Sequence, residues 1–169
     1  MVNFVLKNLN GETNGETLGI RYFDAETGET TVNLGVLNYD GKTMSMTLDI
    51  RYPQNAVPEV VTENVTKAAE AEELEVLKCS VTPVLYVPKD SELVKKLSTV
   101  FESQTGMNLE PLAIGGGTYA KAFKNMVAFG PGFPGKEYGC HECNEYVEID
   151  EMIKSCQIVT SAMYEMAQK

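Results

Sequence analysis

The chain has 169 residues, which is enough for one domain or for two small ones. Its apolar fraction of 43% supports a packed core, and no apolar run reaches the roughly 18 residues that a membrane-spanning helix needs. The net charge of −10 disfavours nucleic acid as a partner, because an acidic surface repels phosphates. The N-terminus lacks a basic segment followed by a long apolar block, so we expect a cytoplasmic protein without a signal peptide.

The first half of the chain predicts an antiparallel sheet covered by a helix. Strands are expected at 18–23, 31–39 and 43–52, with Asp40-Gly41 as the hairpin turn between the last two. The third of these strands alternates most cleanly, and Pro53 ends it because proline cannot donate to a ladder. A helix is expected from Pro58 to Ala71, and residues 74–87 are expected to be extended although Pro83 interrupts them.

The second half predicts alternating helices and strands, which is typical of α/β layers. Asp90 is the expected N-cap of a helix over 91–104, and Gly106 would lie just past its end. The remaining expected elements are a short buried strand at 111–114, a glycine turn with a short helix at 119–123, a strand at 126–130, a loop at 131–135 and a helix at 149–169. The apolar face of that last helix would consist of Ile149, Met152, Ile153, Cys156, Val159, Ala162, Met163 and Met166. The fold class expected for the whole chain is therefore mixed, α+β followed by α/β.

Two features could bind an anion. The run Gly115-Gly116-Gly117-Thr118 could point several backbone N–H groups at a carboxylate or phosphate, or it could be a tight turn that needs positive φ. The run matches neither the G-x-G-x-x-G pattern nor a Walker loop, so nucleotide binding is not supported. Arg51 lies beside Asp49 on the polar face of its strand; this is either a solvated ion pair, the commoner case, or a guanidinium fork aimed at an anion.

A third feature is Cys140-His141-Glu142-Cys143, which contains the only histidine. A structural zinc site needs about four ligands. Cys140, His141 and Cys143 share one tight turn and cannot easily face one ion, and Cys79 and Cys156 stand alone, so a structural zinc site is disfavoured. A redox pair is also disfavoured, because Asn144-Glu145 does not open a helix after it.

Several motifs together resemble one enzyme family. They are MTLDIRYP at 46–53, Gly116-Gly117-Thr118-Tyr119-Ala120, Phe129-Gly130-Pro131 and His141-Glu142-Cys143-Asn144-Glu145. In this order and spacing they resemble the dizinc dipeptidases of the dipeptidase V type, within the aminoacylase/carboxypeptidase-G family of metallopeptidases. The resemblance covers nearly the whole chain and implies two parts: residues 1–87 as the second half of a lid domain, and residues 88–169 as the C-terminal part of a catalytic domain.

The resemblance also implies roles for individual residues. His141 would be a ligand of the second of two zinc ions, and Arg51 would bind the C-terminal carboxylate of a dipeptide substrate. The backbone of Gly116, Gly117 and Thr118 would help to hold that carboxylate, and Asn144 and Glu145 would support the loop around the metal. The zinc ions would activate a water molecule while a glutamate carries its proton.

The chain departs from this family pattern in one decisive respect. One histidine cannot supply the family's H-x-D motif, the lid's own histidine and His141 together. The resemblance therefore implies a fragment without catalytic residues, inactive alone, whose partner is the N-terminal half of the enzyme. Two alternatives are a non-catalytic α+β module that self-associates through an exposed sheet edge, and a small cysteine-zinc protein.

Overall fold

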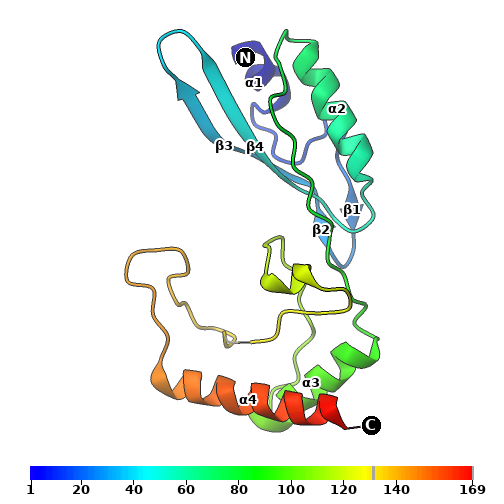
Figure 1. Ribbon diagram of the computed structural model, residues 1–169, viewed down its shortest axis with the longest axis vertical. Helices are drawn as coiled ribbons and strands as arrows, with labels where there is room; N and C mark the ends of the chain where they lie inside the picture. Colours follow the sequence, from blue (N-terminus) through cyan, green and yellow to red (C-terminus); the bar gives the residue numbers. More distant parts are fainter. Residues whose placement is uncertain (131, 169) are drawn as a thin grey trace. The chain divides into compact units, whose positions relative to one another are not determined.

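The computed structural model describes residues 1–130 and 132–168. Two compact units are present: Met1–Val84 with Ala113–Gly117, and Leu85–Leu112 with Thr118–Lys169. Helices combine with two small antiparallel sheets, which confirms the mixed fold class (Figure 1). Within the described ranges, no helix combines the length and the hydropathy needed to cross a bilayer.

The first unit is built on a long hairpin. Strand β3 (Thr31–Tyr39) pairs antiparallel with β4 (Met44–Arg51), with a bulge between Leu34 and Val36. The carboxylate of Asp40 accepts the N–H groups of Lys42 (2.8 Å) and Thr43 (2.7 Å) and so closes the turn. These contacts confirm the predicted hairpin, and the pairing places Arg51 at the end of β4, opposite Thr31.

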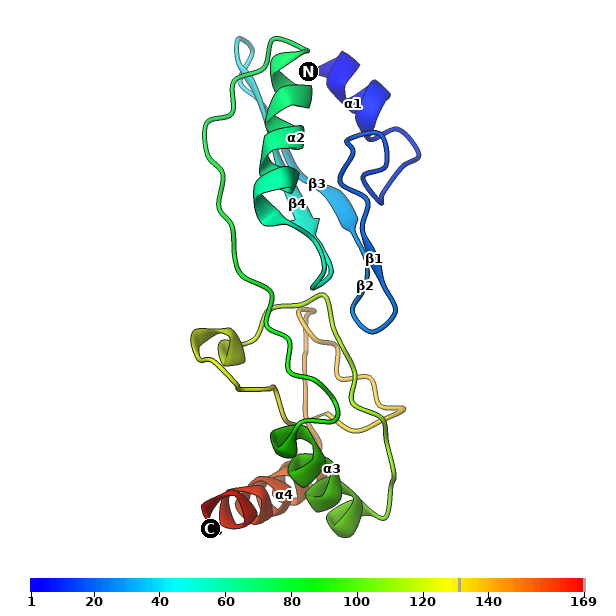
Figure 2. The same ribbon diagram turned by 90° about the vertical axis from the view of Figure 1, so that its right-hand side faces the viewer.

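Two helices and a looped segment supply the rest of this unit's core. Helix α1 (Val2–Asn8) was not predicted, whereas α2 (Pro58–Glu70) was, with Pro58 in its first turn. Figure 2 shows both helices beside the hairpin. The buried core residues are Phe4, Leu18, Ile20, Val32, Val61 and Ala69, and Met46, Leu48 and Ile50 of β4 pack against them. The alternation in the sequence of β4 therefore predicted correctly that Met46, Leu48 and Ile50 face the core.

Two predicted strands of this unit are wrong. Residues 18–23 form a looped segment in which only Phe23 joins a strand, β1 (Phe23–Asp24), paired with β2 (Gly28–Glu29). The N–H of Ile20 bonds to the carbonyl of Gly15 (2.9 Å), so Leu18 and Ile20 are buried by turns and not by a pleat. Residues 74–87, which were expected to be extended, have no regular secondary structure, because an extended segment becomes a strand only when a partner strand offers a ladder.

In the second unit, two predicted helices are confirmed. Helix α3 (Glu92–Thr105) begins one residue later than expected, because Ser91 and not Asp90 caps it, accepting the N–H of Val94 at 3.3 Å. Gly106 ends it at φ 72°, as predicted. Helix α4 (Ile149–Ala167) packs on α3 around Val100, Ile158 and Ala162.

The predicted helix–strand alternation of this half is wrong. No strand forms at 111–114 or at 126–130, and Leu112 is 88% exposed. The element at 119–123 is a single turn, η1 (Tyr119–Ala122). The predicted inward face of α4 is also wrong, since Ala162 alone of its eight residues is buried. The expected loop at 131–135 lies partly outside the described residues, which omit position 131.

The β1–β2 turn carries a pH-dependent contact. The Asp24 carboxylate accepts the N–H (2.8 Å) and the hydroxyl (2.8 Å) of Thr27, and these bonds hold the pKa of Asp24 below its ordinary value of 3.8. Stability from this group is therefore present above pH 3.8 and is lost as the pH falls through the lowered pKa.

We expect Asp24→Asn to lower the free energy of unfolding at about pH 6 and to lower it less at about pH 2, because the carboxylate gains its proton as the pH falls. Urea unfolding at the two pH values measures this. An equal difference at both values would show that the charge of Asp24 contributes nothing.

Candidate functional site

Arg51 stands where the hairpin ends. Its Nη2 lies 3.1 Å and its Nε 3.3 Å from Oδ2 of Asp49, because residues two apart on a strand share a face. Both side chains are 53% exposed. The solvated ion pair expected from sequence is thus present, and it orients the guanidinium without enclosing it.

The glycine run lies against this guanidinium. Ala113–Gly117 belongs to the same compact unit as the hairpin, and a methyl group on Gly115 would lie 3.6 Å from Cδ and 3.9 Å from Nη1 of Arg51. Neither Gly115 nor Gly116 has a positive φ, so the turn does not require glycine for left-handed geometry there. Gly115 therefore places backbone without a side chain beside Cδ and Nη1 of Arg51. A fork-shaped cation beside exposed backbone can bind a carboxylate in a bidentate way.

Thr118, the last residue of the predicted anion site, lacks the features of a helix N-terminal anion site. Thr118 belongs to the second unit and precedes η1, which has four residues. A single turn of this kind has too few aligned peptides for a substantial helix dipole. Thr118 makes no capping hydrogen bond with its side chain, and its carbonyl accepts the N–H of Lys121 at 3.1 Å.

The role of the space at Gly115 can be measured. We expect Gly115→Ala to fold normally, since its new contacts would be ordinary van der Waals distances, but to weaken acetate binding at Arg51 about fivefold by narrowing access to Nη1. An NMR titration that follows the Nε–H of Arg51 measures the affinity. Gly35→Ala is the matched control, because Gly35 lies on the same hairpin and also has ordinary space for a methyl group. Equal acetate affinity in both variants would exclude an anion site at Gly115.

His141 lies in an exposed loop of the second unit. Its φ is 66°, that of Asn144 is 65°, and Glu142 N–H bonds to the carbonyl of Gly139 at 2.9 Å. Asn144 and Glu145 are exposed as well. Cys140 and Cys143 are free and exposed, as are Cys79 and Cys156. Over residues 1–130 and 132–168, no three His, Cys, Asp or Glu side chains come together to hold a metal ion.

The base of this loop involves residues that sequence reasoning missed. Lys136 Nζ lies 3.0 Å from Oε1 of Glu148 and 3.0 Å from Oε1 of Glu151, at the start of α4. Tyr146 N–H donates to the carbonyl of Tyr138 at 3.1 Å. The available signal was one lysine upstream of an acidic helix start, a pattern too common to single out.

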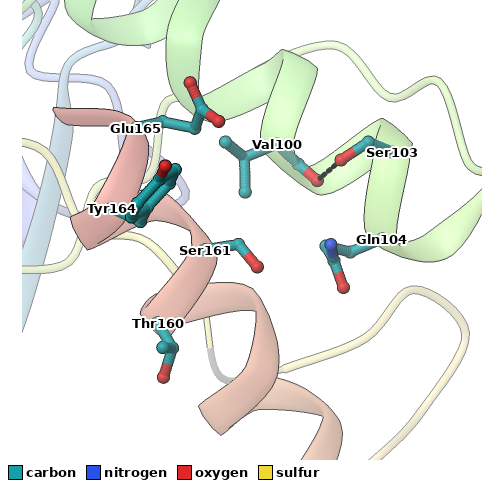
Figure 3. Close-up of a pocket in the computed structure, with 7 residues that line it drawn as sticks. All are labelled: Val100, Ser103, Gln104, Thr160, Ser161, Tyr164 and Glu165. Carbon is teal, nitrogen blue, oxygen red and sulfur yellow. Dashed lines mark hydrogen bonds between the residues drawn. The ribbon is translucent and has the colours of Figure 1, made fainter. Parts of the chain in front are cut away.

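A groove of about 380 Å³ lies between α3 and α4 (Figure 3). It contains none of the predicted site residues and is lined by Val100, Ser103, Gln104, Thr160, Ser161, Tyr164 and Glu165. The hydroxyls of Ser103 and Thr160 donate to carbonyls of their own helices, at 2.8 and 2.7 Å. Because none of the predicted site residues lines this groove, it is not the candidate site.

Comparison with known proteins agrees with the motifs. Residues 3–165 match the profile of "Peptidase family M20/M25/M40". The chain is 39% identical over 167 residues to a Bacillus subtilis (strain 168) protein named "Putative dipeptidase YtjP", covering 98% of this chain and 35% of that protein. A Staphylococcus aureus (strain USA300) protein with the same description is 32% identical over 153 residues, covering 90% of this chain and 33% of its own length. The chain thus spans about a third of the length of these relatives. It belongs to peptidase family M20/M25/M40.

Proposed function

We propose that this chain contributes the substrate-carboxylate subsite of a zinc-dependent dipeptidase of the dipeptidase V type. One observation carries the proposal: the half-exposed guanidinium of Arg51 lies against the backbone of Gly115. The dipeptidase names of the relatives support a peptide as substrate.

Arg51 would select the substrate by its free C-terminal carboxylate. Asp49 holds Nε and Nη2 from one side, so the guanidinium meets the carboxylate in a fixed orientation. Backbone N–H groups of Gly116, Gly117 and Thr118 would add donors to the same carboxylate. A longer peptide would place a neutral peptide group where the arginine requires a charge, and this mismatch favours dipeptides.

The metal would be held only in part by this chain. The described residues present one exposed imidazole, His141, and no group of three ligands, so they do not fit a zinc site by themselves. We infer that His141 is one ligand of a two-zinc centre whose other ligands and general base come from elsewhere in the enzyme, with Asn144 and Glu145 supporting its loop. The isolated chain is then inactive.

We expect calorimetry of the isolated chain with zinc to show no tight stoichiometric binding, because one histidine without carboxylate partners is a poor site. His141→Gln should remove the weak heat that remains. Tight binding that survives His141→Gln but disappears in Cys140→Ser/Cys143→Ser would contradict the proposal and favour the cysteine-zinc alternative.

A chimera tests the function itself. This chain would replace the aligned third of the Bacillus subtilis relative, and hydrolysis of L-alanyl-L-alanine would be compared with that of its C-terminal amide. Cleavage of the free dipeptide with little cleavage of the amide is the expected result. Equal cleavage of both, or an inactive chimera beside an active parent, would overturn the proposal.

One observation favours the second candidate, self-association. Among the described residues, β3 and β4 form a sheet of two strands, and Leu37 and Tyr39 near its tip are 55% and 65% exposed. Analytical ultracentrifugation of the isolated chain tests whether it self-associates. A stable monomer at high concentration would exclude this candidate.

A further inference from the structure

We propose that Lys136 is a positioning residue, which fixes the loop that presents His141 by bridging Glu148 and Glu151. This inference rests on the proposed role of His141 as a metal ligand. The bridge joins the segment before the loop to the start of α4 after it, with Lys136 Nζ at 3.0 Å from each carboxylate.

A second closure lies inside the first. Tyr146 donates its N–H to the carbonyl of Tyr138 (3.1 Å) and its hydroxyl to the carbonyl of Glu137 (3.0 Å). The two tyrosine rings lie 6.4 Å apart with a tilt of 58°. Both ends of the stretch that contains His141 are therefore tied.

The enclosed backbone needs such ties. His141 and Asn144 both have positive φ values, 66° and 65°, a backbone conformation that is strained for residues other than glycine. An untied, exposed loop would relax to negative φ and turn the imidazole elsewhere. The direction of His141 thus depends on the closures at the loop base.

Charge makes Lys136 the central residue of the outer closure. The side chain of Glu151 is 14% exposed, and its buried Oε2 accepts no hydrogen bond within the described residues. Lys136 is the cation that compensates this carboxylate, and hydrogen bonds to Glu148 and Glu151 raise the pKa of Lys136. Removing the ammonium would leave a largely buried carboxylate without its cation, which a shift of the loop toward water would relieve.

The experiment uses the whole chain and its single histidine, whose NMR signals are unambiguous. We compare Lys136→Met, Lys136→Arg and the control Lys67→Met, which removes a lysine–glutamate pair of α2 in the other unit. The readouts are hydrogen exchange of the Tyr146 amide and the strong NOE between the amide and α protons of His141 that a positive φ produces. Lys136→Met should speed the exchange about tenfold and abolish the NOE, since a charged hydrogen bond is lost.

Lys136→Arg should restore both readouts, because arginine keeps the charge and the donors, and Lys67→Met should change neither. Unchanged exchange and NOE in Lys136→Met would overturn the proposal, and so would equal changes in Lys67→Met. If Lys136→Met fails to fold, Glu151→Gln tests the same bridge from its other side, and an unaltered His141 there overturns the proposal equally. None of these readouts involves metal or hydrolysis. An inactive chimera would therefore contradict the proposed function without contradicting the role of Lys136 in positioning His141.

Discussion

In the chimera with the Bacillus subtilis relative, Arg51→Met is expected to lower kcat/KM for L-alanyl-L-alanine about 100-fold or more. Loss of one partner of a desolvated, hydrogen-bonded charge pair costs about 2–5 kcal/mol. Most of the loss should appear in KM, because the carboxylate takes no part in the bond changes and is bound similarly in the ground and transition states. Arg51→Lys should lose less, since it keeps the charge but not the planar fork. Steady-state kinetics measures kcat and KM for the purified chimera and for its Arg51→Met and Arg51→Lys variants.

Arg21 offers a matched control for this prediction. It is also a half-exposed arginine of the same unit, paired with Glu16 (2.7 Å) and Glu29 (2.6 Å). Arg21→Met should change kcat/KM by less than about threefold, the effect of an ordinary surface ion pair. The C-terminal amide provides the substrate control, because it lacks the charge that Arg51 binds. If Arg51→Met loses activity equally on the amide, Arg51 does not bind the carboxylate.

The second large effect concerns the core of the first unit. Phe4→Ala is expected to lower the free energy of unfolding by about 3–5 kcal/mol, because it removes a buried ring and leaves a cavity. Phe4 is 1% exposed and packs in the cluster that includes Ile20 and Val61. Urea unfolding followed by circular dichroism measures the change.

Phe23→Ala is the control for this substitution, since it removes the same side chain from a position that is 68% exposed. It should change stability by no more than about 0.5 kcal/mol. A similarly small effect of Phe4→Ala would mean that α1 is not a docked part of the unit in solution.

Local chemistry made part of the fold predictable. The alternation of β4, the Asp40-Gly41 turn, Pro58 at the start of α2 and Gly106 after α3 each depend on nearest neighbours along the chain. Strict alternation is the clearest of these signals, because a strand with one buried face cannot shift by one residue without exposing its apolar side chains.

Other predictions failed where a distant partner decides the outcome. Residues 111–114 and 126–130 have strand-like composition, but among the described residues no strand pairs with them. Helix α4 shows the same dependence, since Ile158 and Ala162 are buried only because α3 packs there, while Met152 and Met163 of the predicted face stay exposed. Helix α1 was missed because seven residues carry too little periodic signal.

The candidate site divides in the same way. The residue types can be read from the sequence: one arginine on a polar strand face, a glycine run, a single histidine, and motifs in an order that resembles one peptidase family. The approach of Gly115 to Nη1 of Arg51, and the contact of Lys136 with Glu151 across the His141 loop, appear only when the chain is folded. The physical reason is that these contacts join segments far apart in the chain, and the closeness of such segments depends on packing that no local pattern encodes.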